Sequence, residues 1–448
     1  MKKTITLLLL LFTISNFHAQ CWSKFALGSF HTLAVANDGS LWAWGNNYQG
    51  QLGIGNNIDQ YTATRVGTDN NWAFVEAGDQ DSFAIKTDGT LWAWGRNEFG
   101  QLGDGSALQR TTPVQIGTDT DWKFVSNHEN HTFALKTDNT LWGWGNEVDD
   151  YGFINSMVPV QIGTDTWNFI CASQHYAVGI KSDGTLWVWG KNEYGQLGDG
   201  TTTTRLNPIQ IGTDNQWAFV SALGNHTMAV KLDGSLWGWG ANYYGFLGDG
   251  TVANKSVPTQ IGTDLNWKAV SAGYLTTKAI KTDGSLWAWG DNSIGQLGDG
   301  TTINKVIPTH IGTATNWTAV IHSFAHSQIG IQDDGTLWGW GNNQFGQTTG
   351  NGTNGWSLVP TMITCPSLST SENHLAAFSF YPNPVKGKLY FNNETNITHI
   401  SVFDFSGRLI HSDIINENEV DLSALATGNY IAKVSAGNKV MNIKVTKE

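Results

Sequence analysis

The sequence predicts an all-β protein, a seven-bladed β-propeller followed by a small C-terminal β-sandwich. The propeller follows from two series of repeated residues. A motif LWxWG recurs at spacings of 50, 50, 45, 50, 50 and 51 residues, with its last glycine at Gly45, Gly95, Gly145, Gly190, Gly240, Gly290 and Gly341. A second series opens each unit, at Trp22, Trp72, Trp122, Trp167, Trp217, Trp267 and Trp317. A period near fifty residues without helical periodicity indicates a repeat architecture.

One repeat, beginning at Trp217, reads as four short strands. WAFVSALG and HTMAVKL are two β-rich runs, and the hairpin signal Asp233-Gly234 leads into the returning strand SLWGWG. The glycine-rich ANYYGFLGDGT then forms a long loop, and VPTQIG supplies a fourth strand. Four strands per repeat describe one propeller blade. Because both faces of an inner strand are buried between blades, the tryptophans are explained as core residues.

The units carry the pattern G..HT.A......G.L..WG.N..GQLG.G, and residues from Trp22 to near Thr364 resemble the regulator-of-chromosome-condensation repeat family. This resemblance implies a seven-bladed propeller. Repeat 3 departs from the pattern, because the chain after Gly145 reads NEVDDYGFINSMVP and lacks GQLGDG. Repeat 7 also departs, with GQTTGNG in the corresponding loop.

The N-terminus, MKKTITLLLLLFTISNFHAQ, has two lysines, a short apolar run and then small and polar residues. We interpret residues 1–20 as a secretory signal peptide, since the apolar run is too short to span a membrane. Residues 21–364 then form the propeller and residues 365–377 a linker. Cleavage leaves Cys21 near the mature N-terminus, where lipid attachment is an alternative that Gln20 fits poorly. Ring closure brings Cys21 close to Cys365, so a disulfide and two free thiols are both open.

Residues 378–448 differ in character from the repeats and alternate apolar and polar residues, as in a small β-sandwich. They resemble the type A C-terminal sorting domain of the type IX secretion system. The resemblance implies a Bacteroidetes-type bacterium, the secretion machinery as a partner, and a secreted or outer-membrane surface-attached protein reached through the periplasm. Its landmarks are Tyr381, Pro382, Asn383, Pro384, Asp404, Gly407, Asp421, Leu422, Gly428 and Tyr430.

Several function classes find no support in the sequence. The net charge of −12 disfavours nucleic acid as a partner. No catalytic residues, cofactor or metal are predicted. His31, His131 and His226 occupy one repeated position and are interpreted as structural, and the Asp of each GDG loop as a turn residue rather than a calcium ligand. Cys171 is expected to be a buried free thiol, and the protein a monomer without a transmembrane segment.

The positions that vary among the repeats are more informative about function. Side chains around the constant Asn of G-x-N differ from copy to copy, and repeat 3 contributes an acidic and aromatic insertion. If these loops share one rim, they present a mixed aromatic and charged surface of the kind used in protein recognition. The alternative is that the aromatic rings pack beneath their own loops. The candidate rim residues are Arg96, Phe99, Glu147, Asp149, Asp150, Tyr151, Lys191, Tyr194, Tyr243, Tyr244, Asp291 and Phe345.

The sequence therefore favours a secreted or surface-displayed propeller that binds an extracellular protein or glycan. An extracellular carbohydrate-active enzyme, a lyase or hydrolase, is the alternative and requires convergent acid or base groups. The repeat-family resemblance also implies guanine-nucleotide exchange. This activity is disfavoured because export separates the chain from a small GTPase. The identity of the ligand and the face of the ring that binds it are not encoded in any motif.

Overall fold

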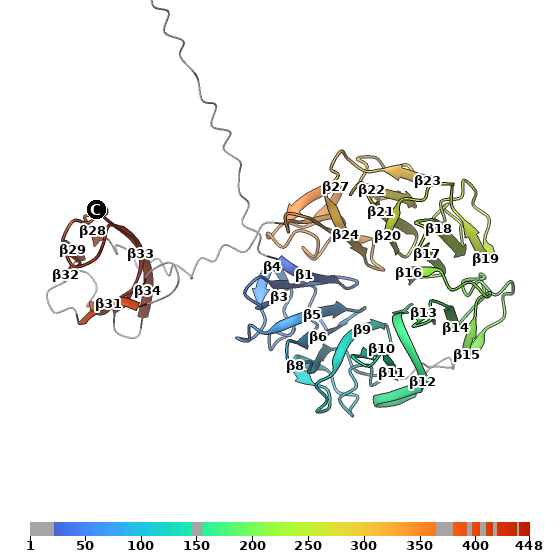
Figure 1. The fold of residues 1–448 in the computed structure, drawn as a ribbon, viewed down its shortest axis with the longest axis horizontal. Helices are drawn as coiled ribbons and strands as arrows, with labels where there is room; N and C mark the ends of the chain where they lie inside the picture. The colour runs from blue at the N-terminus through green and yellow to red at the C-terminus, as the bar shows by residue number, and fades with distance from the viewer. Residues whose placement is uncertain are drawn as a thin grey trace, which may run out of the picture. The chain divides into compact units, whose positions relative to one another are not determined.

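The computed structural model describes residues 22–145, 155–363, 380–391, 397–403, 409–414, 419–436 and 439–448. Every element in these ranges is a β-strand, so the all-β prediction is confirmed. The chain divides into two compact units, Met1–Cys365 and Pro366–Glu448. The first unit is a ring of antiparallel sheets around a central channel (Figure 1). In the described ranges no helix has the length and apolar character needed to cross a membrane.

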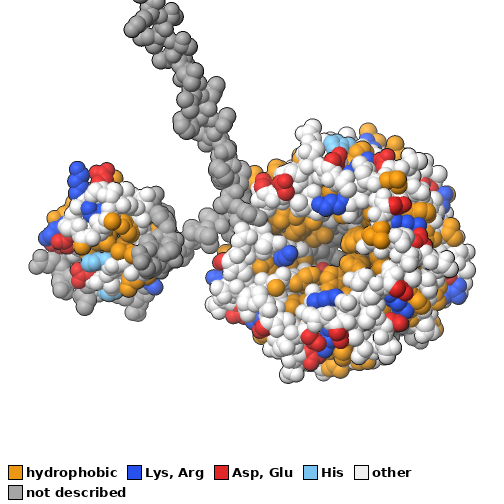
Figure 2. All heavy atoms as spheres, viewed as in Figure 1, with side chains coloured by type: hydrophobic (Ala, Val, Ile, Leu, Met, Phe, Trp, Pro, Cys, Tyr) orange, Lys and Arg blue, Asp and Glu red, His pale blue; other side chains and the backbone are white. Residues whose placement is uncertain are grey.

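The first strand of each repeat lines the channel, a cavity of about 500 Å³ visible as the central hollow in Figure 2. Each of these strands begins or passes through the repeat-opening tryptophan, whose indole is buried away from the channel. The strands are β1 (Trp22–Leu27), β5 (Trp72–Ala77), β9 (Trp122–His128), β12 (Ser156–Ala172), β16 (Trp217–Leu223), β20 (Trp267–Ala272) and β24 (Trp317–His322).

The second strand of each repeat is buried along almost its whole length, because neighbouring repeats cover both of its faces. This explains why its residues are apolar or small with few charges. These strands are β2 (His31–Ala36), β6 (Asp81–Lys86), β10 (His131–Lys136), β13 (Tyr176–Lys181), β17 (His226–Lys231), β21 (Thr276–Lys281) and β25 (Ser327–Gln332).

The third strand carries LWxWG. In β3 the indole of Trp42 is half-buried and donates to Ser40 Oγ at 2.9 Å, whereas Trp44 is fully buried. The two tryptophans of the motif therefore have different environments. The third strands are β3 (Leu41–Gly45), β7 (Leu91–Gly95), β11 (Thr140–Gly145), β14 (Leu186–Gly190), β18 (Leu236–Gly240), β22 (Leu286–Gly290) and β26 (Leu337–Asn343).

The fourth strand forms the outer edge of each sheet. Six of the seven contain a proline, which removes a ladder donor and protects an exposed edge from pairing with another chain. The outer strands are the first half of β12 together with β4 (Gln60–Arg65), β8 (Arg110–Gln115), β15 (Arg205–Gln210), β19 (Lys255–Gln260), β23 (Lys305–His310) and β27 (Gly355–Ile363).

The core lies between repeats rather than inside them. Leu33, Leu41 and Ala43 of repeat 1 form one buried cluster with Trp72 and Trp94 of repeat 2. The last such cluster joins Trp22 and Trp44 of repeat 1 to Ile329, Leu337 and Ile363 of repeat 7, and so closes the ring. The strands form five four-stranded sheets and one seven-stranded sheet, in which β12 belongs to both repeat 3 and repeat 4.

The loop after the third strand, which reads GQLG in four of the repeats, makes contacts between neighbouring repeats. The Gln51 carbonyl accepts hydrogen bonds from Trp94 Nε1 (2.8 Å) and Ser82 Oγ (2.8 Å) of repeat 2. The Gln347 carbonyl makes the same two bonds, from Trp44 Nε1 and Thr32 Oγ1, across the ring closure. The buried indole N–H groups of Trp44 and Trp94 thereby obtain an acceptor from the neighbouring repeat. The acceptor is a backbone carbonyl, and Phe246 supplies it in the same way to Trp289 and Thr277, so this contact explains the recurring tryptophan and hydroxyl residues.

The second unit contains two sheets around one shared core. One sheet has the order β28–β29–β32 and the other β31–β30–β33–β34. Leu389, Ile400, Val402, Val420 and Val434 are among the residues buried between them. The strands are β28 (Phe380–Tyr381), β29 (Lys388–Phe391), β30 (Ile397–Phe403), β31 (Leu409–Ile414), β32 (Glu419–Asp421), β33 (Gly428–Ala436) and β34 (Lys439–Lys447).

Candidate functional site: the loop face and the channel mouth

Two kinds of loop lie on the same face of the ring. The amide of Asn46, in the long loop after β3, donates to the Phe30 carbonyl in the turn between β1 and β2 at 2.8 Å. Lys191 makes the same bond to His175 in repeat 4. In antiparallel sheets the hairpins between second and third strands must then lie on the opposite face. We call the side with the long loops the loop face, and the opposite side the hairpin face.

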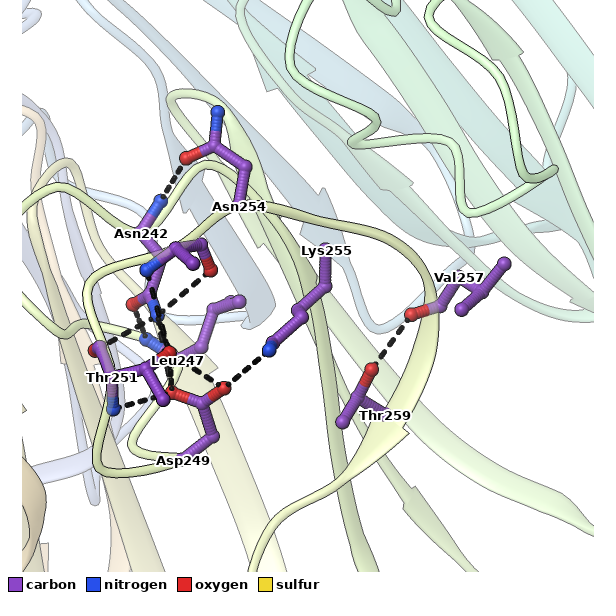
Figure 3. Close-up of polar contacts among 9 residues, drawn as sticks. Asn242, Leu247, Asp249, Thr251, Asn254, Lys255, Val257 and Thr259 are labelled. Carbon is purple, nitrogen blue, oxygen red and sulfur yellow. Dashed lines mark hydrogen bonds and ion pairs between the residues drawn. The ribbon is translucent and has the colours of Figure 1, made fainter.

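The long loops are built around the constant Asn of G-x-N (Figure 3). In repeat 5, Asn242 Nδ2 donates to the Thr251 carbonyl at 3.0 Å, and Asn242 Oδ1 accepts from the Leu247 amide at 2.9 Å. Asp249 accepts the Thr251 amide at 2.9 Å and forms an ion pair with Lys255 at 3.2 Å. The Asp of GDG is therefore a turn residue, as predicted, with its carboxylate already engaged. The constant residues hold the loop, and the residues between them vary from repeat to repeat.

The candidate aromatic residues have different exposures on this face. Tyr243 and Tyr244 are 47% and 44% exposed, and the Tyr243 ring packs edge-on against Tyr194 of the preceding repeat at 5.6 Å. Phe345 is half-buried against Phe30 at 5.4 Å. Tyr243 and Tyr244 are thus exposed beside the half-buried Tyr194 of repeat 4. Phe345 of repeat 7 instead packs against the turn of repeat 1 that contains Phe30.

The candidate charged residues are also placed by the structure. Arg96 pairs with Glu98 at 3.1 Å and lies over the Phe99 ring at 5.1 Å. Lys191 pairs with Glu193 at 3.2 Å. Asp291 is only 5% exposed, and its carboxylate accepts Gln296 Nε2 at 2.6 Å, so it supports its loop and does not belong to the exposed surface.

Some of the predicted residues lie outside the described ranges. These are the signal peptide, the repeat 3 insertion with Glu147, Asp149, Asp150 and Tyr151, the proposed pair Cys21 and Cys365, the linker, and the landmarks Asp404 and Gly407. Cys171 is a free thiol in the channel wall, and burial raises its pKa to about 12.

Two of the repeated histidines, His31 and His226, contact the neighbouring repeat. His31 Nε2 contacts Ser82 Oγ at 2.8 Å, and His226 Nε2 contacts Thr277 Oγ1 at 3.1 Å. Burial lowers the pKa of His31, and likewise that of His226, to about 3, so both are neutral at physiological pH. They serve the ring as hydrogen-bonding residues, in agreement with the sequence interpretation.

The channel mouth on the loop face is surrounded by turns that differ in every repeat. Each turn joins the first strand of a repeat to its second strand and places two or three residues around the mouth. The turn sequences are Ser29-Phe30, Asp79-Gln80, Glu129-Asn130, Gln174-His175, Gly224-Asn225, Tyr274-Leu275 and Phe324-Ala325. This variation in an otherwise regular ring marks the mouth as a candidate recognition site.

Repeat 2 places three carboxyl groups at one side of this mouth. Glu76 and Asp79 line the channel, and Asp81 is buried behind them with 1% exposure. Asp81 Oδ1 accepts Asn127 Nδ2 of repeat 3, and Glu76 accepts the Asn127 amide. Burial, with the nearby Asp79 charge, raises the pKa of Asp81 to about 8, and burial raises that of Glu76 to about 8. Both groups are therefore largely protonated at neutral pH.

Aromatic rings occupy the opposite side of the mouth. Tyr274 and Phe324, from repeats 6 and 7, lie 4.1 Å apart between ring centroids. Phe324 also reaches the ring of His128 in repeat 3, at 6.1 Å. A contact between repeats 7 and 3 crosses the channel, so Phe324 narrows its mouth. Burial lowers the pKa of His128 to about 4, and its imidazole is neutral.

Repeat 6 also departs from the repeat pattern, because it has a buried lysine in its second strand. Lys278 is fully buried at a position where other repeats have Leu33, Phe83, Val178 or Met228. Its ammonium contacts Thr276 Oγ1 at 3.3 Å, and burial lowers its pKa well below the usual value. Lys278 is absent from the channel wall.

The raised pKa of Asp81 predicts a pH-dependent stability. Between about pH 4 and pH 8 the folded state keeps a proton that the unfolded state has lost, so stability falls as pH rises, by up to about 1.4 kcal/mol per pH unit for each such group. Asp81→Asn keeps an oxygen that accepts from Asn127 but has no carboxyl group to titrate, so it removes the Asp81 contribution to this pH dependence. Chemical unfolding at pH 6.5 to 8 should show the variant gaining stability over the wild type as pH increases. Lys278 changes the stability of both proteins with pH by the same amount. Parallel curves of stability against pH for the two proteins would therefore contradict the raised pKa of Asp81.

Glu76, Asp81 and Lys278 were missed by the sequence analysis. The signal was present, since Glu76 replaces Ser126, Ser221 or Ser271 of other repeats and Asp81 replaces the repeated histidine. Glu76 and Lys278 are charged residues at positions where the other repeats have uncharged ones, and this difference along the first and second strands distinguishes them in the sequence.

Comparison with known proteins agrees with this architecture. The family model described as RCC1-like domain matches residues 12–327. The chain belongs to the RCC1-like domain family. A second model, described as secretion system C-terminal sorting domain, matches residues 379–448. The chain is thus a secreted RCC1-like propeller module with a type IX sorting domain.

Solved structures share the fold of this RCC1-like chain. Human WBSCR16 superposes with a TM-score of 0.65 and 20% identity over 73% of this chain and 94% of that one. Prp20p from Saccharomyces cerevisiae, studied for its binding to Gsp1p and histones, has a TM-score of 0.59 and 20% identity over 66% and 79% of the two chains. The ultraviolet-B receptor UVR8 of Arabidopsis thaliana is 46% identical over 44 residues, so the match spans about a tenth of each protein.

Proposed function

We propose that the mature RCC1-like propeller is a binding module that recognises an extracellular protein or glycan through its loop face. The observation that supports this most strongly is the distribution of variation. The residues that build the loops and join the repeats recur, while the side chains around the mouth and on the loop tips differ in each copy. A surface that varies on a constant scaffold is typical of recognition sites.

The exposed tyrosines are the best candidates for anchoring residues. Tyr194, Tyr243 and Tyr244 lie together on two neighbouring repeats, and rigid aromatic side chains often dominate interface energetics. Tyr48, 74% exposed in repeat 1, adds a further exposed aromatic side chain on the same face. This composition favours binding over catalysis.

Each alternative function requires a different arrangement of residues. A lyase or hydrolase needs an acid and a base held on either side of a scissile bond. Glu76, Asp79 and Asp81 all come from repeat 2, on one side of a mouth narrowed by Phe324. Nucleotide exchange rests only on the repeat-family resemblance, and the solved structures compared above, at 20% identity, carry the fold alone.

A capture experiment tests the binding proposal. The wild-type chain is immobilised and exposed to material from its native surroundings, and a specifically retained partner is then titrated against variants. The triple variant Tyr194→Ala, Tyr243→Ala, Tyr244→Ala should bind that partner at least about 30-fold more weakly, as for loss of a 2 kcal/mol hot spot.

The control changes the hairpin face of the same ring. Leu232 and Leu265 are 68% and 59% exposed near the hairpin of repeat 5, so Leu232→Ala with Leu265→Ala removes comparable apolar surface there. This control should bind like the wild type. Retention by the tyrosine variant with loss in the leucine variant would place the binding site on the hairpin face and refute the proposal.

We also propose that the propeller reaches the outer-membrane surface or the medium through its sorting domain. In that domain the landmark Asn383 and the neighbouring Val385 hold the last strand: the Val385 amide donates to the Thr446 carbonyl at 2.7 Å, and the Thr446 amide donates to Asn383 Oδ1 at 2.8 Å. Tyr430 OH donates to the Ala426 carbonyl at 2.9 Å. These contacts give the domain a defined C-terminal strand that secretion machinery can recognise.

A further inference from the structure

Repeats 2 to 6 each hold a lysine ammonium against two tryptophan rings. The lysine ends the second strand, and the rings, here called the tryptophan pair, are the tryptophan that opens the repeat and the first tryptophan of LWxWG. In repeat 6, Lys281 Nζ lies 4.7 Å from the ring centre of Trp267 and 4.2 Å from that of Trp287. It also pairs with Asp264 at 2.7 Å. The same arrangement recurs at Lys86, Lys136, Lys181 and Lys231.

Repeat 7 keeps the tryptophan pair and lacks both charged residues. Its rings, Trp317 and Trp338, lie 6.2 Å apart at 68°, close to the 5.9 Å and 76° of repeat 6. Gln332 occupies the lysine position, because it pairs in register with Trp317 as the lysine pairs with its own repeat-opening tryptophan. Ala314 replaces the aspartate, since GTDLNW of the preceding repeat corresponds to GTATNW. The geometry of the pair therefore does not depend on the ion pair.

A cavity of about 350 Å³ adjoins this tryptophan pair, between repeats 6 and 7. Trp317, Trp338, Gln332 and Ala314 all line it, so it lies where the other repeats place their lysine and aspartate. Its wall includes the exposed Thr313, and the cavity therefore opens to solvent. Small-molecule sites typically measure roughly 300–1,000 Å³, so a small ligand fits this volume.

The two exchanged residues determine which cation suits the cavity. A primary ammonium has three N–H donors, and in the other repeats the aspartate accepts from them. Ala314 provides no such carboxylate, and Gln332 Oε1 accepts from Asn316 Nδ2 at 3.3 Å. The Asp299 carboxylate in the wall is paired with Lys305 at 3.3 Å. A quaternary ammonium needs no acceptor and is attracted by the faces of tryptophan rings, so it fits better than a primary ammonium.

We infer that the cavity between repeats 6 and 7 binds a quaternary ammonium group, such as that of choline, against Trp317 and Trp338. A free solute and a phosphocholine headgroup share this chemistry. Gln332 directly precedes the hairpin turn of its repeat, so the site lies away from the loop face. It is a second binding site, beyond the proposed function.

The test titrates three small probes against the full chain by ligand-observed NMR. Choline carries the quaternary ammonium, dimethylbutanol is its neutral carbon isostere, and ethanolamine has the same tail with a primary ammonium. Choline should bind at least about tenfold more tightly than either of the others, because only choline combines charge with freedom from N–H donors. Equal binding of choline and its isostere, tighter binding of ethanolamine, or no binding of choline would overturn the inference.

Matched variants locate the site. Gln332→Lys with Ala314→Asp restores the ion pair of repeats 2 to 6 without changing the net charge, so the variant should fold and melt no lower than the wild type. Its own ammonium should occupy the tryptophan pair and weaken choline binding at least about tenfold. The control is Leu232→Ala with Leu265→Ala on the same face, which should bind choline like the wild type. Unchanged choline binding in the restored variant, or equal weakening in both variants, would overturn the assignment.

Phosphatidylcholine vesicles distinguish the two sources of the ligand. Sedimentation of the chain with these vesicles, reversed by free choline, would identify a headgroup as the ligand. Choline binding without such sedimentation would identify a free solute.

This inference and the proposed function fail separately. The triple tyrosine variant leaves the repeat 7 cavity intact and should bind choline like the wild type. If a partner is captured through the tyrosines but choline does not bind, only the repeat 7 site is wrong. If choline binds but partner capture does not depend on the loop face, only the proposed function is wrong.

Discussion

Replacing Trp94 with alanine should destabilise the propeller by about 3–5 kcal/mol. Trp94 is fully buried in the core shared by repeats 1 and 2, and its indole N–H donates to the Gln51 carbonyl at 2.8 Å. The substitution leaves a large cavity and removes one of the bonds that join the two repeats. Urea unfolding of the full chain, followed by tryptophan fluorescence, measures the change as a lower midpoint concentration.

The control for this prediction is Trp356→Ala in the outer strand β27. Trp356 is 53% exposed, so its removal should change stability by no more than about 0.5 kcal/mol. An equal loss of stability in both variants would show that packing between repeats is not the reason why Trp94 stabilises the propeller.

Deleting residues 378–448 should abolish delivery to the cell surface or medium and leave the propeller in the periplasm. The sorting domain is a compact unit with its own core, separate from the ring, so its removal exposes none of the cores between repeats. Fractionation of cells expressing the full and truncated chains, with immunodetection of the propeller, measures the distribution.

A matched folding check accompanies this deletion. The truncated propeller recovered from the periplasm should melt at the same temperature as the corresponding transition of the full chain. Surface delivery of the truncated chain would contradict the sorting role. A lowered melting temperature would show instead that the ring depends on the second unit.

Much of the fold could be predicted because seven copies of one sequence pattern occur along the chain. The tryptophans recur in all seven repeats, the Asp-Gly turn in six and the Gln-Leu-Gly loop in four. Each corresponds to a strand, a hairpin or a contact between repeats in the structure. The bond from Trp94 to the Gln51 carbonyl was not predictable, because it joins two repeats through a backbone atom.

The candidate site was predictable only in part. Position in the repeat identified the tyrosines of repeats 4 and 5, but their exposure depends on contacts such as that between Tyr194 and Tyr243. Asp291 looks like a surface charge in the sequence and is instead buried by a hydrogen bond within its loop. The approach of Phe324 to His128 links repeats far apart in the chain and depends on the ring closure.

The central claim, that the loop face is the recognition surface, is tested most directly by hydrogen–deuterium exchange of the full chain with and without its captured partner. The account predicts slower exchange in the turns around the channel mouth and in the loops of repeats 4 and 5, residues 191–204 and 241–254. Exchange in the hairpins around Asp233-Gly234 and Asp283-Gly284 should not change. Protection confined to those hairpins or to the outer strands would contradict the claim.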